Sequence, residues 1–340
     1  MMAGQRQVDT VTEKTTQEDR VIADHAQFLI TTAARSPSVH NTQPWRFRVE
    51  SPAIELYCDP QRKLRADPLG REMLISCGAA VFGLRLAMRW LGYLPVVELL
   101  PDSSRPRLMA RVTAGAAAPV TGGERQMLEA VPHRHTHRGP FEPGPLPAGL
   151  LAGLQHDALV EGAELALVDG GLAYQRLADI VAVAARRLDL DPRARADTRR
   201  WTRGAADSQA RDGVPAVAFA ARARLRPGRL PQRDFDLDRG LARLSAGGEI
   251  PAATAVLLTR GDRRAEWLCA GQALHRLLLH AASTWVFASL HTQPLEVTVT
   301  RGLIRDRLAL TGYPQMLLQF GRVRTTHPSA RRRAEELTDP

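Results

Sequence analysis

Two long helical patterns constrain what this chain can fold into. The first extends from Arg71 to Leu91, and its apolar and small residues cover most of the helix circumference, as expected for a helix buried at the centre of a lobe. The second extends from Arg264 to Phe287 and carries a similar set on its buried side. Apolar runs that predict strands accompany both patterns. Two lobes of one plan indicate an internal duplication, although no repeat is visible residue by residue.

The rest of the chain divides around these two lobes. Residues 1–20 are polar with few apolar anchors, so we expect a disordered tail. The first lobe is predicted over residues 21–123 and the second over residues 124–324. Residues 203–251 are rich in Arg, Gly and Pro with weak periodicity, which is typical of a lid or a disordered insertion. The polar and basic residues 325–340 are expected to be flexible.

Composition and motif searches exclude several classes of function. The chain has 340 residues, a net charge of +10 and only three cysteines, Cys58, Cys77 and Cys269, with no CxxC pair. This set argues against a disulfide framework and against a zinc site. No signal peptide, membrane-length apolar run or nucleic-acid-binding motif is present, so we predict a cytoplasmic protein with small-molecule partners. A Rossmann glycine motif, a Walker loop and a nucleophile elbow are also absent.

Residues 34–47 form a loop between an apolar helical pattern and a predicted strand. Pro37 and Pro44 stiffen this loop. Its short polar side chains and free backbone amides can hold the polar edge of a heterocycle. These side chains belong to Ser36, Ser38, Asn41 and Gln43. The alternative is a turn that simply ends the helix, and His40 is interpreted as a loop residue rather than as a base.

The second candidate segment is rich in arginine and histidine and spans residues 133–138. Arg134 and Arg138 lie four residues apart around Thr136, so two guanidinium groups and a hydroxyl can grip a phosphate. A solvated basic turn is the alternative. The histidines at 133, 135 and 137 alternate as metal ligands could, but no nearby carboxylate or cysteine completes a ligand set. We therefore predict no metal.

Both segments resemble a known family. Residues 36–47, Ser-Pro-Ser-Val-His-Asn-Thr-Gln-Pro-Trp-Arg-Phe, resemble the A-P-S-x-x-N-x-Q-P-W-x-F signature of the FMN-dependent nitroreductase superfamily. Residues 134–138 resemble its R-x-S-x-R/K-x-F segment, and residues 271–279 and 312–321 are similar to its closing half. The resemblance covers most of residues 22–323. It implies a nitroreductase-like α+β fold in which two fused lobes, each with an antiparallel-rich sheet around a long central helix, resemble an intertwined dimer in one chain.

The resemblance also implies a cofactor, FMN, and a set of residues around it. The loop would lie beside the isoalloxazine ring, and the arginine segment would hold the phosphate. The implied cofactor-binding residues are Pro37, Ser38, Val39, Asn41, Gln43, Arg134, His135, Thr136, Arg138, Trp285, Ser289 and Arg322. Where the family has a G-L-x-x turn near the ring, this chain has Thr284-Trp285-Val286-Phe287, without the glycine.

Each lobe lacks the element that the other carries. The loop lies in the first lobe and the arginine segment in the second, so the two lobes could build one complete site, as in the Acg-like, fused two-lobe branch of the superfamily. The resemblance then implies hydride transfer through flavin N5 from NAD(P)H to a quinone or nitroaromatic, with no catalytic side chain. The alternative is a protein that sequesters FMN or senses redox state. We expect a monomer that acts as a pseudo-dimer, or a weak homodimer.

Overall fold

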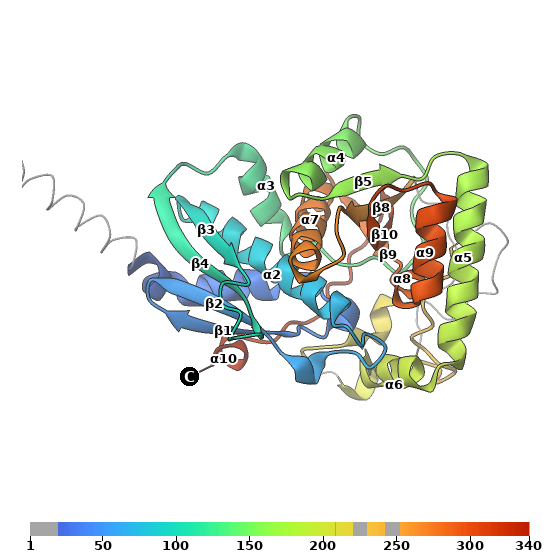
Figure 1. Ribbon diagram of the computed structural model, residues 1–340, viewed down its shortest axis with the longest axis horizontal. Coiled ribbons are helices and arrows are strands. Elements are labelled where there is room, and N and C mark those ends of the chain that lie inside the picture. The colour runs from blue at the N-terminus through green and yellow to red at the C-terminus, as the bar shows by residue number, and fades with distance from the viewer. Residues whose placement is uncertain (1–19, 208, 220–229, 242–251, 340) are drawn as a thin grey trace, which may run out of the picture.

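The computed structural model describes residues 20–207, 209–219, 230–241 and 252–339. Two four-stranded sheets lie on opposite sides of a central pair of long helices (Figure 1). Every pair of neighbouring strands within these two sheets is antiparallel. The structure confirms the expected α+β class, with an antiparallel sheet beside each long central helix.

The first sheet follows a helix over residues 20–34 and has the strand order β1-β2-β4-β3. Its strands are β1 (Trp45–Glu50), β2 (Ala53–Cys58), β3 (Tyr93–Leu99) and β4 (Leu108–Ala117). Helix α2 (Arg71–Trp90) connects β2 to β3 and is buried along most of its length. Trp45 and Phe47 alternate along β1 toward the core, and neither is exposed to solvent. This alternation is what places one face of the sheet on the helices.

The second sheet repeats this connectivity. Its strands are β5 (Glu164–Leu167), β8 (Ala253–Thr259), β9 (Val286–Leu290) and β10 (Tyr313–Arg322), in the order β5-β8-β10-β9. Helix α7 (Arg264–Ser283) connects β8 to β9, as α2 connects β2 to β3. The sequence predicted that this helix would extend to Phe287, but it ends at Ser283. The reason is local, because Trp285 adopts the left-handed backbone region with φ of 60°.

Helices α2 and α7 touch through their backbones where two glycines meet. A Cβ atom on Gly78 would lie 2.1 Å from the carbonyl oxygen of Leu268, and one on Gly271 would lie 2.0 Å from that of Ile75. Both glycines are the eighth residue of a 20-residue helix, counted from Arg71 and from Arg264. Only glycine permits such an approach. The two helices therefore cross at equivalent positions.

Smaller elements cover the remaining faces. The other helices are α3 (Gly122–Ala130), α4 (Leu150–Val160), α5 (Gly171–Leu190), α6 (Pro192–Arg200), α8 (Gln293–Glu296), α9 (Thr298–Arg307) and α10 (Ala334–Leu337). Short strands β6 (Thr202–Arg203) and β7 (Val214–Pro215) form a parallel pair. Helices α5, α8 and α9 lie on the side of the second sheet away from α7 (Figure 1), where Val181 and Ile304 pack against Val256 of β8. The second sheet is thus buried on both faces.

One helix among the described residues has the length and hydropathy of a membrane span. It is α2, and 89% of the relevant window is buried inside the protein. A central core helix has the same composition, because it is surrounded by apolar side chains on every side.

The structure describes the two predicted tails and the predicted lid to different extents. Residues 1–19 lie outside the described residues, as do residues 208, 220–229 and 242–251 of the predicted lid. The described lid residues form a small apolar cluster of their own, made by Val214, Ala216, Ala218, Phe219 and Phe235. This cluster is separate from the core between the sheets.

The C-terminal segment is ordered, contrary to the expectation of a flexible tail over residues 325–340. Leu337 in α10 is 0% exposed and packs into the main core. The backbone N–H of Asp339 donates to the carbonyl oxygen of Phe47 at 2.9 Å. The segment's polar composition concealed this, since two apolar residues one helical turn apart, Ala334 and Leu337, suffice to anchor it.

We predict that Gly78→Ala destabilises the protein because the added methyl group forces the two helix backbones apart. Overpacking of this kind costs about 1–3 kcal/mol or more. Gly302 in α9 is a matched control, since a Cβ there meets nothing within 4 Å, and Gly302→Ala should stabilise the helix by about 0.5–1 kcal/mol. Urea unfolding of both variants measures the difference. Equal stability of Gly78→Ala and wild type would contradict the described crossing.

Candidate functional site

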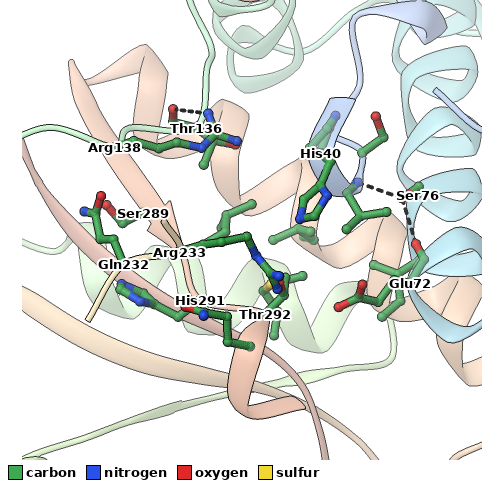
Figure 2. A pocket seen from close by; sticks show the side chains of 18 of the residues that line it. His40, Glu72, Ser76, Thr136, Arg138, Gln232, Arg233, Ser289, His291 and Thr292 are labelled. Carbon is green, nitrogen blue, oxygen red and sulfur yellow. Dashed lines mark hydrogen bonds between the residues drawn. The ribbon is translucent and has the colours of Figure 1, made fainter. Parts of the chain in front are cut away.

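A cavity lies where the two lobes meet, and both lobes line it (Figure 2). The first lobe contributes residues 37–40 and the start of α2. The second contributes residues 136–138, the end of β9, and residues 232–235 of the predicted lid. The cavity volume is about 70 Å³, which is small beside the several hundred Å³ of a typical cofactor site.

The loop of the first lobe is fixed in an unusual backbone conformation. His40, Asn41 and Gln43 all have positive φ, at 47°, 56° and 48°. The backbone N–H of Val39 donates to Ser76 Oγ on α2 at 3.2 Å, and that of Gln43 donates to Ser38 Oγ at 3.0 Å. These bonds compensate for the backbone strain. As a result Pro37, Ser38 and Val39, three of the predicted site residues, line the cavity.

Asn41 and Gln43 do not line the cavity, although the resemblance assigned them to the cofactor. Asn41 Nδ2 donates to the carbonyl oxygens of Gly213 at 2.9 Å and Ala330 at 3.0 Å. Gln43 Nε2 donates to the carbonyl oxygen of Arg211 at 2.8 Å, and its Oε1 accepts from the backbone N–H of Arg332 at 2.9 Å. Both amides therefore fasten the loop to the lid and to the C-terminal segment. The sequence concealed this because those partners are distant in the chain.

The arginine and histidine segment runs beside β9. The backbone N–H of His137 donates to the carbonyl oxygen of Ala288, and Ser289 Oγ donates to that of His137, both at 2.9 Å. This pairing places Thr136, Arg138 and Ser289 on the cavity wall. Three further predicted site residues are thereby brought to the loop of the other lobe.

The three histidines of this segment pack against aromatic rings. The His135 ring lies 4.6 Å from that of Phe287, and burial lowers the pKa of His135 to about 4. Its Nδ1 lies 3.0 Å from the carbonyl oxygen of His133. His135 does not line the cavity. Among the described residues, no group of three His, Cys, Asp or Glu side chains is arranged to hold a metal ion.

Three arginines, the buried Arg134 and the half-buried Arg138 and Arg331, lie close together without a carboxylate partner among the described residues, and of the three Arg138 lines the cavity. Burial lowers the pKa of Arg134 and of Arg138 to about 10, and Arg138 further lowers that of Arg134. Arg331, from the C-terminal segment, has its pKa held well below the usual value by burial and then by Arg134. Their hydrogen bonds go to carbonyl oxygens alone, for instance from Arg134 Nη2 to that of Arg35 at 3.2 Å. Nε and Nη1 of Arg134 and Nε of Arg331 have no partner.

Buried cations without a counter-ion are costly, so this cluster is suited to an anion. The guanidinium fork matches phosphate oxygens in geometry as well as in charge. The unpartnered donors of Arg134 and Arg331 therefore fit the phosphate of a nucleotide-like cofactor. Sequence reasoning missed Arg331 because it lies in the segment expected to be flexible.

The described part of the lid fills much of the cavity. The ring of Phe235 lies 5.3 Å from that of His40, and Arg138 Cζ lies 5.3 Å from the Phe235 ring centre. Arg233 forms an ion pair with Glu296. Burial, followed by the charges of Arg233 and Arg138, holds the pKa of His40 well below its usual value. Bulky lid side chains explain the small cavity volume.

Trp285 and Arg322 lie away from the cavity. Trp285 is 46% exposed, and its Nε1 donates to the carbonyl oxygen of Val323 at 3.2 Å. It precedes β9, whereas the cavity lies at the other end of that strand, beside Ser289. Arg322 Nε donates to the carbonyl oxygen of Pro145 at 3.2 Å. The missing glycine before β9 therefore does not shape this cavity.

Several cavity residues were not among the predicted site residues. They come from separate elements and approach one another only in the folded chain: Glu72, Arg233, Phe235, Leu274, His291, Gln293 and Met316. His40 lies in the predicted loop, but it was interpreted there only as a loop residue. Glu72 sits in the first turn of a core helix, where an acidic residue is common for electrostatic reasons. The sequence alone therefore does not distinguish a carboxyl group that faces a cavity from one that stabilises the start of the helix.

Comparisons with known proteins were made at the level of sequence and structure. No family model matches the chain. A Mycobacterium tuberculosis protein named "Putative NAD(P)H nitroreductase Rv3131" is 33% identical over 303 residues, which are 88% of this chain and 85% of the relative. A second protein of that organism, "Putative NAD(P)H nitroreductase acg", is 28% identical over 88% of this chain and 90% of its own length.

Solved structures resemble the chain more distantly. A nitroreductase with bound FMN from Desulfitobacterium hafniense has a TM-score of 0.41 and 12% identity, and the match covers 63% of this chain and 98% of that one. This likeness is too weak to decide the fold or the ligand. The sequence relatives decide the family, because the identity of 33% extends over most of both chains. The chain belongs to the nitroreductase family.

Proposed function

We propose that this protein is an FMN-binding oxidoreductase that transfers a hydride from NAD(P)H to a quinone or nitroaromatic acceptor. The observation that carries the proposal is the cluster of Arg134, Arg138 and Arg331, without described carboxylate partners, beside a cavity lined by both lobes. Arg134, Arg138 and Arg331 would hold the cofactor phosphate. Residues 37–39 and Ser289 would flank its ring. FMN, when bound, would supply the hydride-carrying chemistry, while the protein binds it, orients it and limits solvent access.

The proposed site is single in each chain. The loop that would meet the ring belongs to the first lobe, and Thr136 and Arg138 belong to the second. The equal strand order of the two sheets and the meeting of Gly78 with Gly271 support an internal duplication. We infer from this plan a monomer that acts as a pseudo-dimer, or a weak homodimer, and we place the protein in the cytoplasm as part of the same proposal.

One observation favours a second candidate function, a protein that sequesters FMN without rapid turnover. The lid residues Arg233 and Phe235 line the cavity, whose volume is about 70 Å³. A lid that stayed closed over the flavin would exclude nicotinamide and bulky acceptors. Steady-state oxidation of NAD(P)H in the presence of a quinone separates the two functions. Turnover that depends on both substrates supports the oxidoreductase, and bound flavin without turnover supports the sequestering protein.

We predict that Arg138→Ala weakens FMN binding by about 1.5–3 kcal/mol, the size of a charge-assisted hydrogen bond. Riboflavin, which lacks the phosphate, should be affected much less. Fluorescence titration of the apo-protein measures both affinities. Arg322→Ala is the matched control, since Arg322 lies outside the cavity, and it should leave both unchanged. Equal losses for FMN and riboflavin in Arg138→Ala would argue against a phosphate grip.

We also predict that Phe235→Ala opens the site while FMN remains bound. Reduction by NAD(P)H in stopped flow should accelerate at least about tenfold, equal to about 1.4 kcal/mol in the barrier. Reduction by dithionite, a small reductant, should change little. Val217→Ala, at a half-exposed lid position away from the cavity, serves as the control. If Phe235→Ala keeps its flavin and reacts at the wild-type rate, the lid does not limit access.

A further inference from the structure

Glu72 is a buried carboxyl group that the proposed function has not used. It is the second residue of α2, its side chain is 4% exposed, and it lines the cavity. Within the part of the chain that the structure describes, neither Oε1 nor Oε2 has a hydrogen-bond partner. Figure 2 shows its carboxyl group directed toward the space beside Arg233 and below His40. Of the described residues that line this cavity, Glu72 and His40 are the two with buried, unpartnered side-chain atoms.

The charged neighbours of Glu72 are engaged elsewhere. Arg71 Nη2 lies 3.6 Å from Glu72 Oε1, but the Arg71 guanidinium donates to the carbonyl oxygens of Gln315 at 3.0 Å and Leu295 at 3.3 Å. Arg233 forms its ion pair with Glu296. The charges of Arg71 and Arg233 therefore attract the carboxyl group, but among the described residues no group donates a hydrogen bond to it.

Burial and then the charge of Glu296 raise the pKa of Glu72 well above its usual value. Asp67 adds to this rise, while Arg71 and Arg233 oppose it. Burial disfavours the ionised form of a carboxyl group that nothing solvates. A protonated group has one O–H donor and one carbonyl acceptor side by side, whereas a carboxylate has acceptors only.

We propose that Glu72 is a ligand-recognition residue, which as a neutral carboxylic acid forms a pair of hydrogen bonds with an amide edge of the bound ligand, where an N–H lies beside a C=O. The acid donates to the ligand's carbonyl oxygen and accepts from its N–H. Two sources of this edge suit the cavity: the imide of a flavin ring and the carboxamide of a nicotinamide ring. The inference rests on the proposed function and names the group that recognises one of its two ring systems.

The hydrogen-bond partners of the Asn41 and Gln43 side chains in the loop support this assignment. Asn41 and Gln43 are the side chains that the sequence suggested for a polar ring edge, but neither lines the cavity, and Asn41 Nδ2 and the amide of Gln43 bind backbone atoms of other segments. Leaving a buried carboxyl group without a hydrogen-bond partner is energetically unfavourable. A ligand that supplies both missing hydrogen bonds removes that cost. Glu72 would therefore strengthen ligand binding and would favour ligands that carry an amide edge.

Two variants test the inference. Glu72→Gln keeps a donor and an acceptor side by side and should bind ligands within about threefold of wild type. Glu72→Met removes both the donor and the acceptor, and it should lower the affinity for the recognised ligand at least about tenfold, or about 1.4 kcal/mol. The probes are riboflavin against 3-methylriboflavin, whose N–H is blocked, titrated into apo-protein by fluorescence. A second comparison titrates NADH and its nicotinic acid analogue into the FMN-loaded full chain and measures the affinity for each.

The two arms distinguish the source of the amide edge. If Glu72 meets the flavin, Glu72→Met loses affinity for riboflavin and none for the methylated compound. If it meets nicotinamide, both flavins bind all variants equally and the loss appears with NADH alone. Unchanged binding of every probe by Glu72→Met, or equal losses in Glu72→Gln and Glu72→Met, would overturn the proposal.

An infrared difference spectrum gives a reading that is independent of ligand binding and of activity. Wild-type apo-protein minus Glu72→Gln at pH 7 should show the carbonyl band of a protonated carboxylic acid. Carboxylate bands in its place would overturn the neutral state that the inference requires. If the protonated-acid band is missing but Arg138→Ala still weakens FMN binding, this inference is wrong and the proposed function remains supported. Absence of any flavin binding by wild type would instead refute the proposed function itself.

Discussion

The backbone contact between α2 and α7 at Gly78 and Gly271 is the constraint on which the rest of the structure depends. It brings two core helices closer than any side chain would permit. Near the crossing, Ser36 Oγ and His275 Nδ1 both lie within hydrogen-bond distance of the carbonyl oxygen of Ala79, at 3.0 and 2.8 Å. The loop of the first lobe is thus joined to the second lobe through α2. The cavity is a consequence of this joint, because its two walls come from the two lobes.

The charged groups in and around the cavity determine which kind of ligand it favours. Burial places Arg134, Arg138 and Arg331 in a region without a described carboxylate partner, and the same burial favours a neutral Glu72. Glu72 and Arg138 line the same cavity, and Arg134 and Arg331 lie near Arg138. An anionic group with a ring that offers a polar edge satisfies both. The folded chain carries the cost of these unpartnered groups, and a bound ligand would relieve it.

The sequence predicted the framework better than the details of the site. Periodicity located both central helices, and the loop and arginine segments do meet in space, because Pro37, Ser38 and Val39 share a cavity with Thr136, Arg138 and Ser289. Local patterns do not reveal partners that are distant in the chain. The bonds from the amides of Asn41 and Gln43 to the backbones of Gly213, Ala330, Arg211 and Arg332 are an example. Arg331 was missed for the same reason, since its segment is anchored by only a few apolar side chains.

The number of FMN molecules bound by each chain shows whether the two lobes share one cofactor site. Purified protein, reconstituted with excess FMN and separated from free cofactor, is denatured, and the released flavin is measured against the protein concentration. The account predicts about one FMN per chain, since one complete set of elements is shared between the two lobes. A ratio near two would contradict the single shared site, and a ratio near zero after reconstitution would contradict the cofactor.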